Sequence, residues 1–302
     1  MHAGHNIGVV IPARNEAEFI NRVLTTLPSW IDLAVVVDDG STDGTAEVAR
    51  QVIGQPAIDI IRLEGEGVGS AINAGHQHLL SRWSEPFVSV VMAGDGQMDP
   101  NDLEAVVDPV ARNVADHSKG ERMSDGCIGM PVVRRVASHM LGFFTTLACG
   151  QRILDPQCGY TATHSRVLKG MNWKKAWKGY GYPNHWLISM AKAGYRIGHV
   201  PVKSVYGDET SGIVKSAFFL KVGGMLILEH HRRNLSWLNP RRGTWSTYAA
   251  LAAYTVGWWA LWPVRTGSVV MVPLAMLAWG MAHLFDRQSV RTHTRRRTHE
   301  KI

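Results

Sequence analysis

Residues 35–45 read VVVDDGSTDGT, three valines that pass directly into a turn rich in aspartate and glycine. The valines predict a short buried strand, expected over residues 33–37, and the polar turn opens a helix expected over residues 46–52. Upstream, a β-branched run at residues 7–12 predicts another strand, and a segment with helical spacing of its apolar residues, 16–27, joins the two. This strand–helix–strand–helix order predicts an α/β fold with a mostly parallel sheet.

Three polar loops follow predicted strands, at residues 12–16 (PARNE), 38–41 (DDGS) and 93–100 (AGDGQMDP), the last after the buried run FVSVVM. Because ligands of parallel sheets gather at the carboxyl ends of the strands, we expect one shared binding site there. Carboxylates flanked by glycines suit a Mg²⁺ or Mn²⁺ ion that carries a diphosphate, although the same residues are common in ordinary turns. The glycines at residues 65–71 (GEGVGSA) precede a further helix, but their spacing does not match a dinucleotide-binding fingerprint.

The composition of the 302-residue chain excludes some classes of protein. With 45% apolar and 19% charged residues the chain is not wholly disordered, and a chain embedded in a membrane throughout is not expected. A net charge of +7 favours a phosphate-rich partner, such as a nucleotide or an anionic membrane surface. The chain carries no recognisable nucleic-acid-binding motif, so we expect no nucleic acid partner. Three cysteines without a CxxC pair predict a reducing compartment.

Two nearly uncharged stretches, residues 248–264 and 269–285, are separated by four residues in the C-terminal part of the chain. Each would span about 26 Å as a helix, near the thickness of the hydrocarbon core of a bilayer. Because arginines flank the pair on both outer sides, we expect a transmembrane hairpin over residues 246–285 with both ends cytoplasmic, followed by a basic tail at residues 286–302. The alternative is a buried hairpin or a homodimer contact. The apolar run at residues 7–12 is too short for a cleavable signal peptide.

Eight motifs in order resemble those of one enzyme family. VVIPARNEA, VVVDDGSTDGT, GEGVGSAINAG and GDGQMDP resemble the family 2 glycosyltransferases of the GT-A fold. ADHSKGERM, MPVVRRVASHM, LDPQCGYTA and VYGDETSGI continue the resemblance, to the branch related to dolichyl-phosphate mannose and glucose synthases. The resemblance implies a GT-A catalytic domain, Rossmann-like with a mostly parallel sheet, over residues 1–235. An apolar stretch with interspersed Lys215 and Lys221 predicts a juxtamembrane amphipathic helix over about residues 213–231, ahead of the membrane hairpin, with a buried amphipathic helix as the alternative.

In this family the first loops hold the nucleotide, which the resemblance places at Pro12, Arg14, Glu16, Asp39, Ser41 and Gly67. The usual metal motif is DxD followed by Gln, and its positions here read Ala93, Asp95 and Gln97, so the first carboxylate is missing. The resemblance therefore implies that Asp95 is the principal metal ligand, with Gln97 as a carbonyl-oxygen ligand and Asp99 as a substitute ligand. Diphosphate and water can complete the shell of Mg²⁺ or Mn²⁺ when protein carboxylates are few.

The resemblance also places the phosphate of a polyprenyl phosphate acceptor, at Arg122, Arg134 and Ser138. Arg134 and Ser138 are four residues apart, so in a helix a guanidinium and a hydroxyl share one face and can grip one phosphate. Exposed arginines that are merely solvated are the alternative interpretation.

Asp155, in LDPQCGY, lies where related enzymes keep a carboxylate near the reacting centre, so the resemblance implies a catalytic role for it beside Asp95. Asp155 acts there either as a base or as a group that orients the substrates, because an ionised phosphate acceptor needs no strong base. Tyr182 and Asn184, in GYGYPNHW, correspond to residues that contact the sugar in relatives.

Together the resemblance implies an inverting transferase that moves a hexose or an N-acetylhexosamine from a UDP- or GDP-sugar to a polyprenyl phosphate. Its expected location is the cell membrane, as a multi-pass protein with a cytoplasmic catalytic domain. One alternative is a metal-dependent glycosyltransferase with a different acceptor, such as a natural-product intermediate or a glycolipid. Another is a non-catalytic sugar-nucleotide-binding membrane protein, which the missing carboxylate at Ala93 allows. Assembly into a homo-oligomer is left open.

Overall fold

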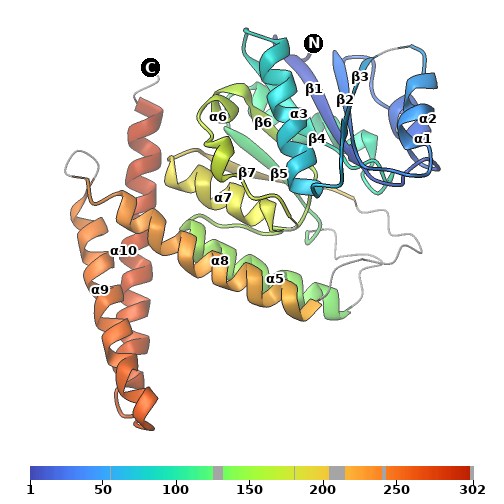
Figure 1. Cartoon of the computed structure of the whole chain (residues 1–302). Helices are drawn as coiled ribbons and strands as arrows, with labels where there is room; N and C mark the ends of the chain where they lie inside the picture. Colours follow the sequence, from blue (N-terminus) through green and yellow to red (C-terminus); the bar gives the residue numbers. More distant parts are fainter. Residues whose placement is uncertain (55, 125–131, 180, 204–214, 240–242, 300–302) are drawn as a thin grey trace.

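A seven-stranded sheet forms the centre of the computed structural model, with strand order β3-β2-β1-β4-β6-β5-β7 (Figure 1). The structure describes residues 1–54, 56–124, 132–179, 181–203, 215–239 and 243–299, excepting the side chains of residues 133–134, 215–220, 265–266 and 298–299. Strand β6 runs antiparallel to both its neighbours, and the other pairs are parallel. The predicted α/β fold with a mostly parallel sheet is thus confirmed. The strands are β1 (Asn6–Ala13), β2 (Leu33–Asp39), β3 (Ala57–Leu63), β4 (Phe87–Val91), β5 (His117–Glu121), β6 (Thr161–His164) and β7 (Ile197–Pro201).

Helices cover both faces of the sheet because the central strands are apolar on both faces. On β1, Val9 and Ile11 pack with α1, α2 and α4, whereas Val10 packs on the opposite face with α3 and α7. Helix α3 lies close to β1 because Gly75 has no side chain: an added Cβ would lie 2.3 Å from Cγ1 of Val10. The helices are α1 (Ile20–Thr25), α2 (Thr45–Gln51), α3 (Val68–Arg82), α4 (Leu103–Ala111), α5 (Val132–Cys149), α6 (Ser165–Lys169), α7 (Tyr182–Lys192), α8 (Lys215–Ser236), α9 (Trp245–Leu261) and α10 (Val272–His299), with 3-10 turns η1 (Pro100–Asp102), η2 (Trp173–Lys175) and η3 (Trp262–Thr266).

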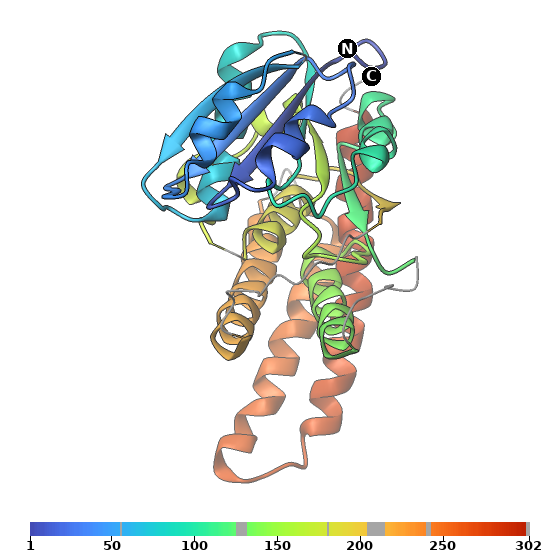
Figure 2. The same cartoon turned by 90° about the vertical axis from the view of Figure 1, so that its right-hand side faces the viewer.

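The C-terminal part of the chain adds helices on one side of this body. Figure 1 shows α5 and α8 side by side beneath the sheet, and Figure 2 shows the antiparallel pair α9–α10 extending past them, away from the sheet. Helices α9 and α10 approach closely at Gly257, where an added Cβ would lie 1.9 Å from Cδ1 of Trp279. The predicted helical hairpin is therefore present.

The expectation that this hairpin is transmembrane is not met. In the part of the chain that the structure describes, no helix combines the length and the apolar character needed to cross a membrane. Helix α9 has 17 residues and gives way to η3, in whose first turn Pro263 lies. The apolar part of α10 ends at Phe285, where Asp286 and Arg287 follow inside the same helix. A helix, α8, begins at Lys215 and continues to Ser236 in the region expected to be helical over residues 213–231, of which residues 213–214 lie outside the described residues.

A buried ion pair fastens the hairpin to the body. Arg233 of α8 and Asp286 of α10 are both 0% exposed, and two hydrogen bonds of 2.9 and 2.6 Å join their side chains. The Nε atom of Arg233 donates to the carbonyl of Ala148 in α5 at 2.9 Å, and its guanidinium lies over the ring of Trp237. Three helices are thereby tied together by one guanidinium.

Removing this guanidinium leaves a buried carboxylate without its partner, and such a loss costs about 3–5 kcal/mol. We therefore expect Arg233→Met to lower the free energy of unfolding by about that amount in chemical denaturation. The neighbouring Arg232 pairs with Glu229 at the surface at 2.6 Å. Arg232→Met is the matched control and should cost under about 1 kcal/mol. Equal losses in the two variants would contradict the anchoring role of Arg233.

Candidate functional site

The loops that follow β1 and β2 are interlocked at the carboxyl edge of the sheet. The backbone N–H of Asn15 donates to Oγ of Ser41 at 2.9 Å, and the N–H of Thr42 donates back to Oδ1 of Asn15 at 3.0 Å. Asn15 adopts a left-handed conformation with φ of 58°, which asparagine tolerates better than most residues. Of the residues predicted to hold the nucleotide, Ser41 is buried and joins the loops, Pro12 and Glu16 are half-buried, and Arg14 is exposed.

Asp39 connects the end of β2 to the glycine-rich loop before α3. Its Oδ1 accepts from the N–H of Glu66 at 2.7 Å, and its Oδ2 accepts from the N–H of Gly67 at 2.8 Å. Gly67 has a φ of 99°, a conformation that favours glycine. The Arg14 guanidinium lies beside this loop, since an added Cβ at Gly65 would be 3.9 Å from it. The structure thus brings Arg14, Asp39 and Gly67 together, as expected of one binding surface.

The amino end of α3 is closed by another segment of the chain. The N–H groups of Gly69 and Ser70 donate to the carbonyl of Lys178 at 2.9 and 3.3 Å. In a dinucleotide-binding fingerprint these groups would face a phosphate. The arrangement agrees with the inference that this glycine cluster is not such a fingerprint.

The loop after β4 carries the predicted metal ligands. It is held next to β1 by a hydrogen bond of 3.1 Å from the N–H of Gly94 to the carbonyl of Pro12. Oδ1 of Asp95 accepts from the N–H of Gln97 at 3.0 Å. Burial raises the pKa of Asp95, and within the described residues the groups that shift it include no cationic side chain. Asp95 is therefore a carboxylate that a bound cation would stabilise.

Asp99, the predicted substitute ligand, caps η1. Its Oδ1 accepts from the backbone N–H and the side-chain amide of Asn101, at 2.9 and 2.8 Å. The carbonyl of Asp99 accepts from the hydroxyl of Tyr160 at 3.1 Å, which joins this loop to the segment that enters β6. The Asp99 carboxylate is therefore already used to cap η1.

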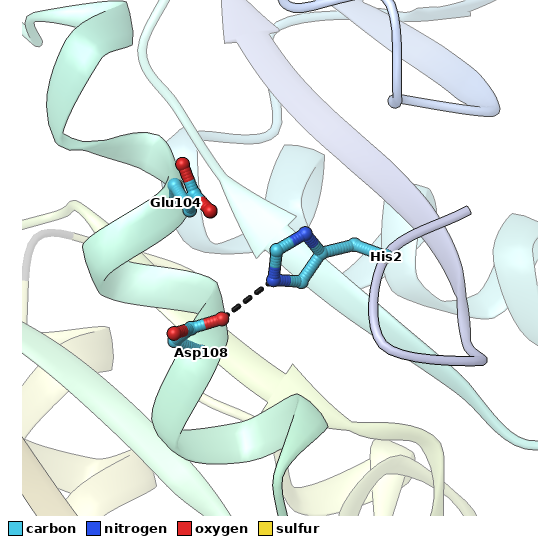
Figure 3. A group of neighbouring side chains, drawn as sticks. All are labelled: His2, Glu104 and Asp108. Carbon is cyan, nitrogen blue, oxygen red and sulfur yellow. Dashed lines mark hydrogen bonds and ion pairs between the residues drawn. The ribbon is translucent and has the colours of Figure 1, made fainter.

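Elsewhere, His2, Glu104 and Asp108 form the one group of three histidine, cysteine or acidic side chains near enough for a metal ion among the described residues (Figure 3). Nε2 of His2 lies 2.5 Å from Oδ1 of Asp108, and Arg112 binds the other oxygen at 3.1 Å. His2 precedes β1, so this group lies at the amino edge of the sheet, opposite the loops that form the site. The hydrogen bond from His2 lowers the pKa of Asp108, so a hydrogen bond between these side chains accounts for the contact.

Asp155 and Arg122 form a buried pair on the other side of the site. Asp155 is 0% exposed, and it accepts from Nε and Nη2 of Arg122 at 2.6 and 3.0 Å. The N–H groups of Gln157 and Cys158 also donate to Oδ1, both at 3.2 Å. Burial alone would raise the pKa of Asp155, but the hydrogen bonds and the charge of Arg122 outweigh it and hold this pKa below its ordinary value. Asp155 is therefore an ionised anchor for Arg122 rather than a ready base.

Lys119 is a further member of this charged cluster, and the sequence reasoning missed it. It lies inside β5, almost fully buried, where its Nζ donates to the carbonyl of Cys158. Burial lowers the pKa of Lys119, and its charge helps to lower that of Asp155. A lysine within the short strand HSKGE was the available signal, because a strand of this sheet exposes little surface.

The remaining predicted residues are placed as follows. Ser138 is buried in α5, and Arg134 lies four residues earlier in the same helix, with its side chain outside the described residues. Tyr182 begins α7 and is half-buried, and burial raises the pKa of its hydroxyl. Asn184 is 0% exposed, donates to Oγ1 of Thr145 at 2.8 Å and accepts from Nε2 of Gln157 at 2.6 Å. In this arrangement Asn184 fastens the Asp155 loop to α5.

Comparison with known proteins places the chain among glycosyltransferases. The sequence profile described as Glycosyl transferase family 2 matches residues 8–171. An uncharacterised protein of Methanocaldococcus jannaschii is 32% identical over 205 residues, covering 67% of this chain and 82% of that protein. The UDP-N-acetylglucosamine–dolichyl-phosphate N-acetylglucosaminyltransferase of Methanococcus voltae is 27% identical, with 67% and 86% covered. The undecaprenyl-phosphate mannosyltransferase of Micrococcus luteus is 29% identical, with 65% and 82% covered.

Solved structures share the fold. Glucosyl-3-phosphoglycerate synthase from Mycobacterium tuberculosis, in complex with UDP, superposes with a TM-score of 0.57 at 22% identity, covering 76% of this chain and 81% of that chain. The same enzyme in complex with Mn²⁺, UDP-glucose and phosphoglyceric acid gives a TM-score of 0.56 at 20% identity, with the same coverage. At this identity the likeness shows the α/β fold alone, that of the GT-A enzymes.

The lowered pKa of Asp155 predicts how acid affects stability. A carboxylate with a depressed pKa stabilises the folded chain above its unfolded-state pKa, and this contribution is lost as the pH falls through the folded-state value. The ordinary value is 3.8. The difference in unfolding free energy between wild type and Asp155→Asn should therefore be constant from about pH 7 to about pH 5 and shrink below about pH 4.

Denaturant titrations across this pH range measure the difference. A wild-type advantage that persists unchanged well below pH 3.8 would contradict the assignment of Asp155 as an ionised anchor.

Proposed function

Because the chain belongs to glycosyl transferase family 2 and is a nucleotide-sugar-dependent glycosyltransferase, we propose that it transfers a hexose or an N-acetylhexosamine to a polyprenyl phosphate, inverting the anomeric configuration. The donor in this proposal is a UDP- or GDP-sugar. The observation that carries it is the buried cluster of Lys119, Arg122 and Asp155, whose segment Tyr160 joins to the loop after β4. Two relatives that are named for dolichyl-phosphate and undecaprenyl-phosphate acceptors support the acceptor class.

The acceptor phosphate binds, in this proposal, at the Arg122 side of the site. Arg122 and Lys119 supply positive charge there, and Asp155 holds the guanidinium of Arg122 in place by two hydrogen bonds. A phosphate is already ionised near neutral pH, so its oxygen can attack the anomeric carbon without a base. The low pKa of Asp155 is consistent with this, because a carboxylate that stays ionised and hydrogen-bonded is a poor proton acceptor. Asp155 thus acts as a positioning residue.

The nucleotide of the donor binds, in this proposal, on the surface formed by Arg14, Asp39 and Gly67. Asp39 holds the glycine-rich loop in place by accepting from the N–H groups of Glu66 and Gly67. Arg14 is exposed beside the glycine-rich loop, and in this proposal its guanidinium contacts the diphosphate. Positioning of both substrates at one sheet edge converts the transfer into an effectively intramolecular step.

The residues after β4 fit a divalent metal ion. Asp95 offers a carboxylate whose pKa burial raises, and Gln97 offers a carbonyl oxygen, so the donor set suits a hard cation such as Mg²⁺ or Mn²⁺. When bound, this ion would neutralise charge on the departing diphosphate. Asp95 and Gln97 would hold it, and the hydrogen bond between Gly94 and Pro12 keeps their loop beside the nucleotide surface.

We further propose that the enzyme works at the cytoplasmic face of the cell membrane, where a polyprenyl phosphate is available. Exposed apolar side chains of α5 and of the hairpin support a lipid contact, among them Phe143, Trp259 and Met276. The arginines of α10 support the cytoplasmic leaflet, because anionic lipids are concentrated there.

The proposal is tested by incubating membranes that contain the protein with a panel of UDP- and GDP-sugars, followed by mass spectrometry of the lipid fraction. We expect a polyprenyl phosphate that has gained one hexose or one N-acetylhexosamine with one donor of the panel. Transfer to another class of acceptor, with no sugar on a phosphate lipid, would overturn it.

Asp95 provides the sharpest single-residue prediction. We expect Asp95→Asn to lower kcat/KM by on the order of 100-fold or more, because charge on the leaving diphosphate loses its stabilisation. Binding of Mn²⁺ in the presence of UDP, measured by electron paramagnetic resonance, should weaken in parallel. Asp99→Asn in the same loop is the control and should have the smaller effect on both, because the Asp99 carboxylate caps η1. Unchanged metal-dependent transfer in Asp95→Asn would contradict the assignment.

A further inference from the structure

Four exposed arginines gather where α10 passes the end of α5. Arg287, Arg291 and Arg295 follow one another at four-residue intervals and so share one face of α10. Arg152, in the segment after α5, lines the same surface together with these three. The surface is hollowed into two adjoining depressions of about 500 and 370 Å³. We refer to Arg152, Arg287, Arg291 and Arg295 as the arginine patch.

Within the described residues, no carboxylate neutralises the positive charge of the arginine patch. Among the residues that the structure describes, no carboxylate lies within ion-pair distance of these four side chains. Asp286, the acidic residue next to the patch in sequence, is buried and binds Arg233 instead. Like charges gathered without partners repel one another, so the patch is suited to an external anion.

An apolar groove continues from the arginine patch along the same helix. Its volume is about 560 Å³, and α5, α8, α9 and α10 all contribute to its walls. On α10 the wall includes Gly280 and His283, which precede Arg287 by seven and four residues and so lie on its face. Other lining residues are mostly apolar or aromatic: Met140, Phe144, Ile227, Tyr254, Trp258 and Trp279.

Beyond the groove, the end of the hairpin that lies farthest from the sheet is strongly apolar (Figure 2). Trp259 and Trp262 are 65% and 66% exposed, and Val270 and Met276 are 80% and 72% exposed. Exposed apolar surface of this extent marks a contact with a membrane or another protein in a water-soluble domain. Along α10, the apolar end of the hairpin is followed by the groove and then by the arginine patch. This order matches the change from hydrocarbon to anionic headgroups at a bilayer surface.

We propose that the arginine patch binds the anionic headgroups of a phospholipid bilayer while the apolar end of the hairpin enters the same leaflet. Each guanidinium donates to phosphate oxygens of a headgroup, and the groove accepts acyl chains. This contact rests on the membrane location proposed above and lies outside the catalytic chemistry, since the headgroup is bound and no group is transferred to it. It directs the enzyme to anionic membranes and fixes which side of the protein faces the lipid.

The test is sedimentation of the purified full-length protein with two kinds of vesicle. One consists of phosphatidylcholine alone, and in the other phosphatidylglycerol replaces one quarter of it. We expect stronger binding to the anionic vesicles, falling as salt is added. In the combined variant Arg287→Gln, Arg291→Gln and Arg295→Gln this binding should fall by on the order of 100-fold, since each basic residue near the surface contributes about a factor of five.

A matched control removes three exposed arginines that lie outside the patch, in α2, at the end of α3 and after α4, with the combined changes Arg50→Gln, Arg82→Gln and Arg112→Gln. Both variants lose the same net charge, so an equal loss of vesicle binding would overturn the patch as a site. Equal binding of the wild type to both kinds of vesicle would overturn it as well. Transfer to an acceptor dispersed in detergent should survive in the patch variant, which separates this proposal from that of the transferase function.

Discussion

Parallel pairing of β2, β1 and β4 is the constraint on which the rest of the site depends. Because these strands run in the same direction, their carboxyl ends deliver Asp39, Arg14 and Asp95 to one edge of the sheet. The strands can be central only because both of their faces are apolar, with Val9 and Val10 packing on opposite sides. The same residues that build the core thus fix where the charged loops lie. Hydrogen bonds between the loops, such as that from Asn15 to Ser41, then set their relative positions.

Two carboxylates of the site have opposite environments, and this difference assigns their roles. Burial raises the pKa of Asp95, and among the described residues no cationic side chain is a cause of this shift, which makes Asp95 a group that gains from a bound metal ion. Asp155 is more deeply buried, but Arg122 outweighs the effect of burial and lowers its pKa. In the proposed function, Asp95 serves the diphosphate of the donor, and Asp155 holds the guanidinium of Arg122 for the acceptor. A general base is not needed when the attacking group is itself an anion.

Much of the architecture could be predicted from local sequence, because strand and helix periodicity are local properties. The valine run before Asp38 and the polar loops after three strands indicated both the sheet and its binding edge. The partners of the site residues could not be predicted in this way. Asp155 meets Arg122 across 33 residues, and Asp39 meets Gly67 across 28 residues, through the folded chain alone. Lys119 was missed because a buried charge in a strand is recognised only once its partners are known.

The hairpin shows that apolar composition alone does not establish a membrane-spanning helix. Two apolar stretches of equal length predicted two equivalent spans, but Pro263 lies in the turn that follows α9, and α10 carries Asp286 as the partner of Arg233.

The most direct test of the central claim compares two acceptors that differ only in their charged group. Purified enzyme, supplied with its nucleotide sugar and Mn²⁺, should glycosylate a polyprenyl phosphate and leave the corresponding polyprenol unmodified. Equal transfer to the polyprenol would contradict the account, because it would show that the acceptor needs neither its own charge nor the Arg122 side of the site.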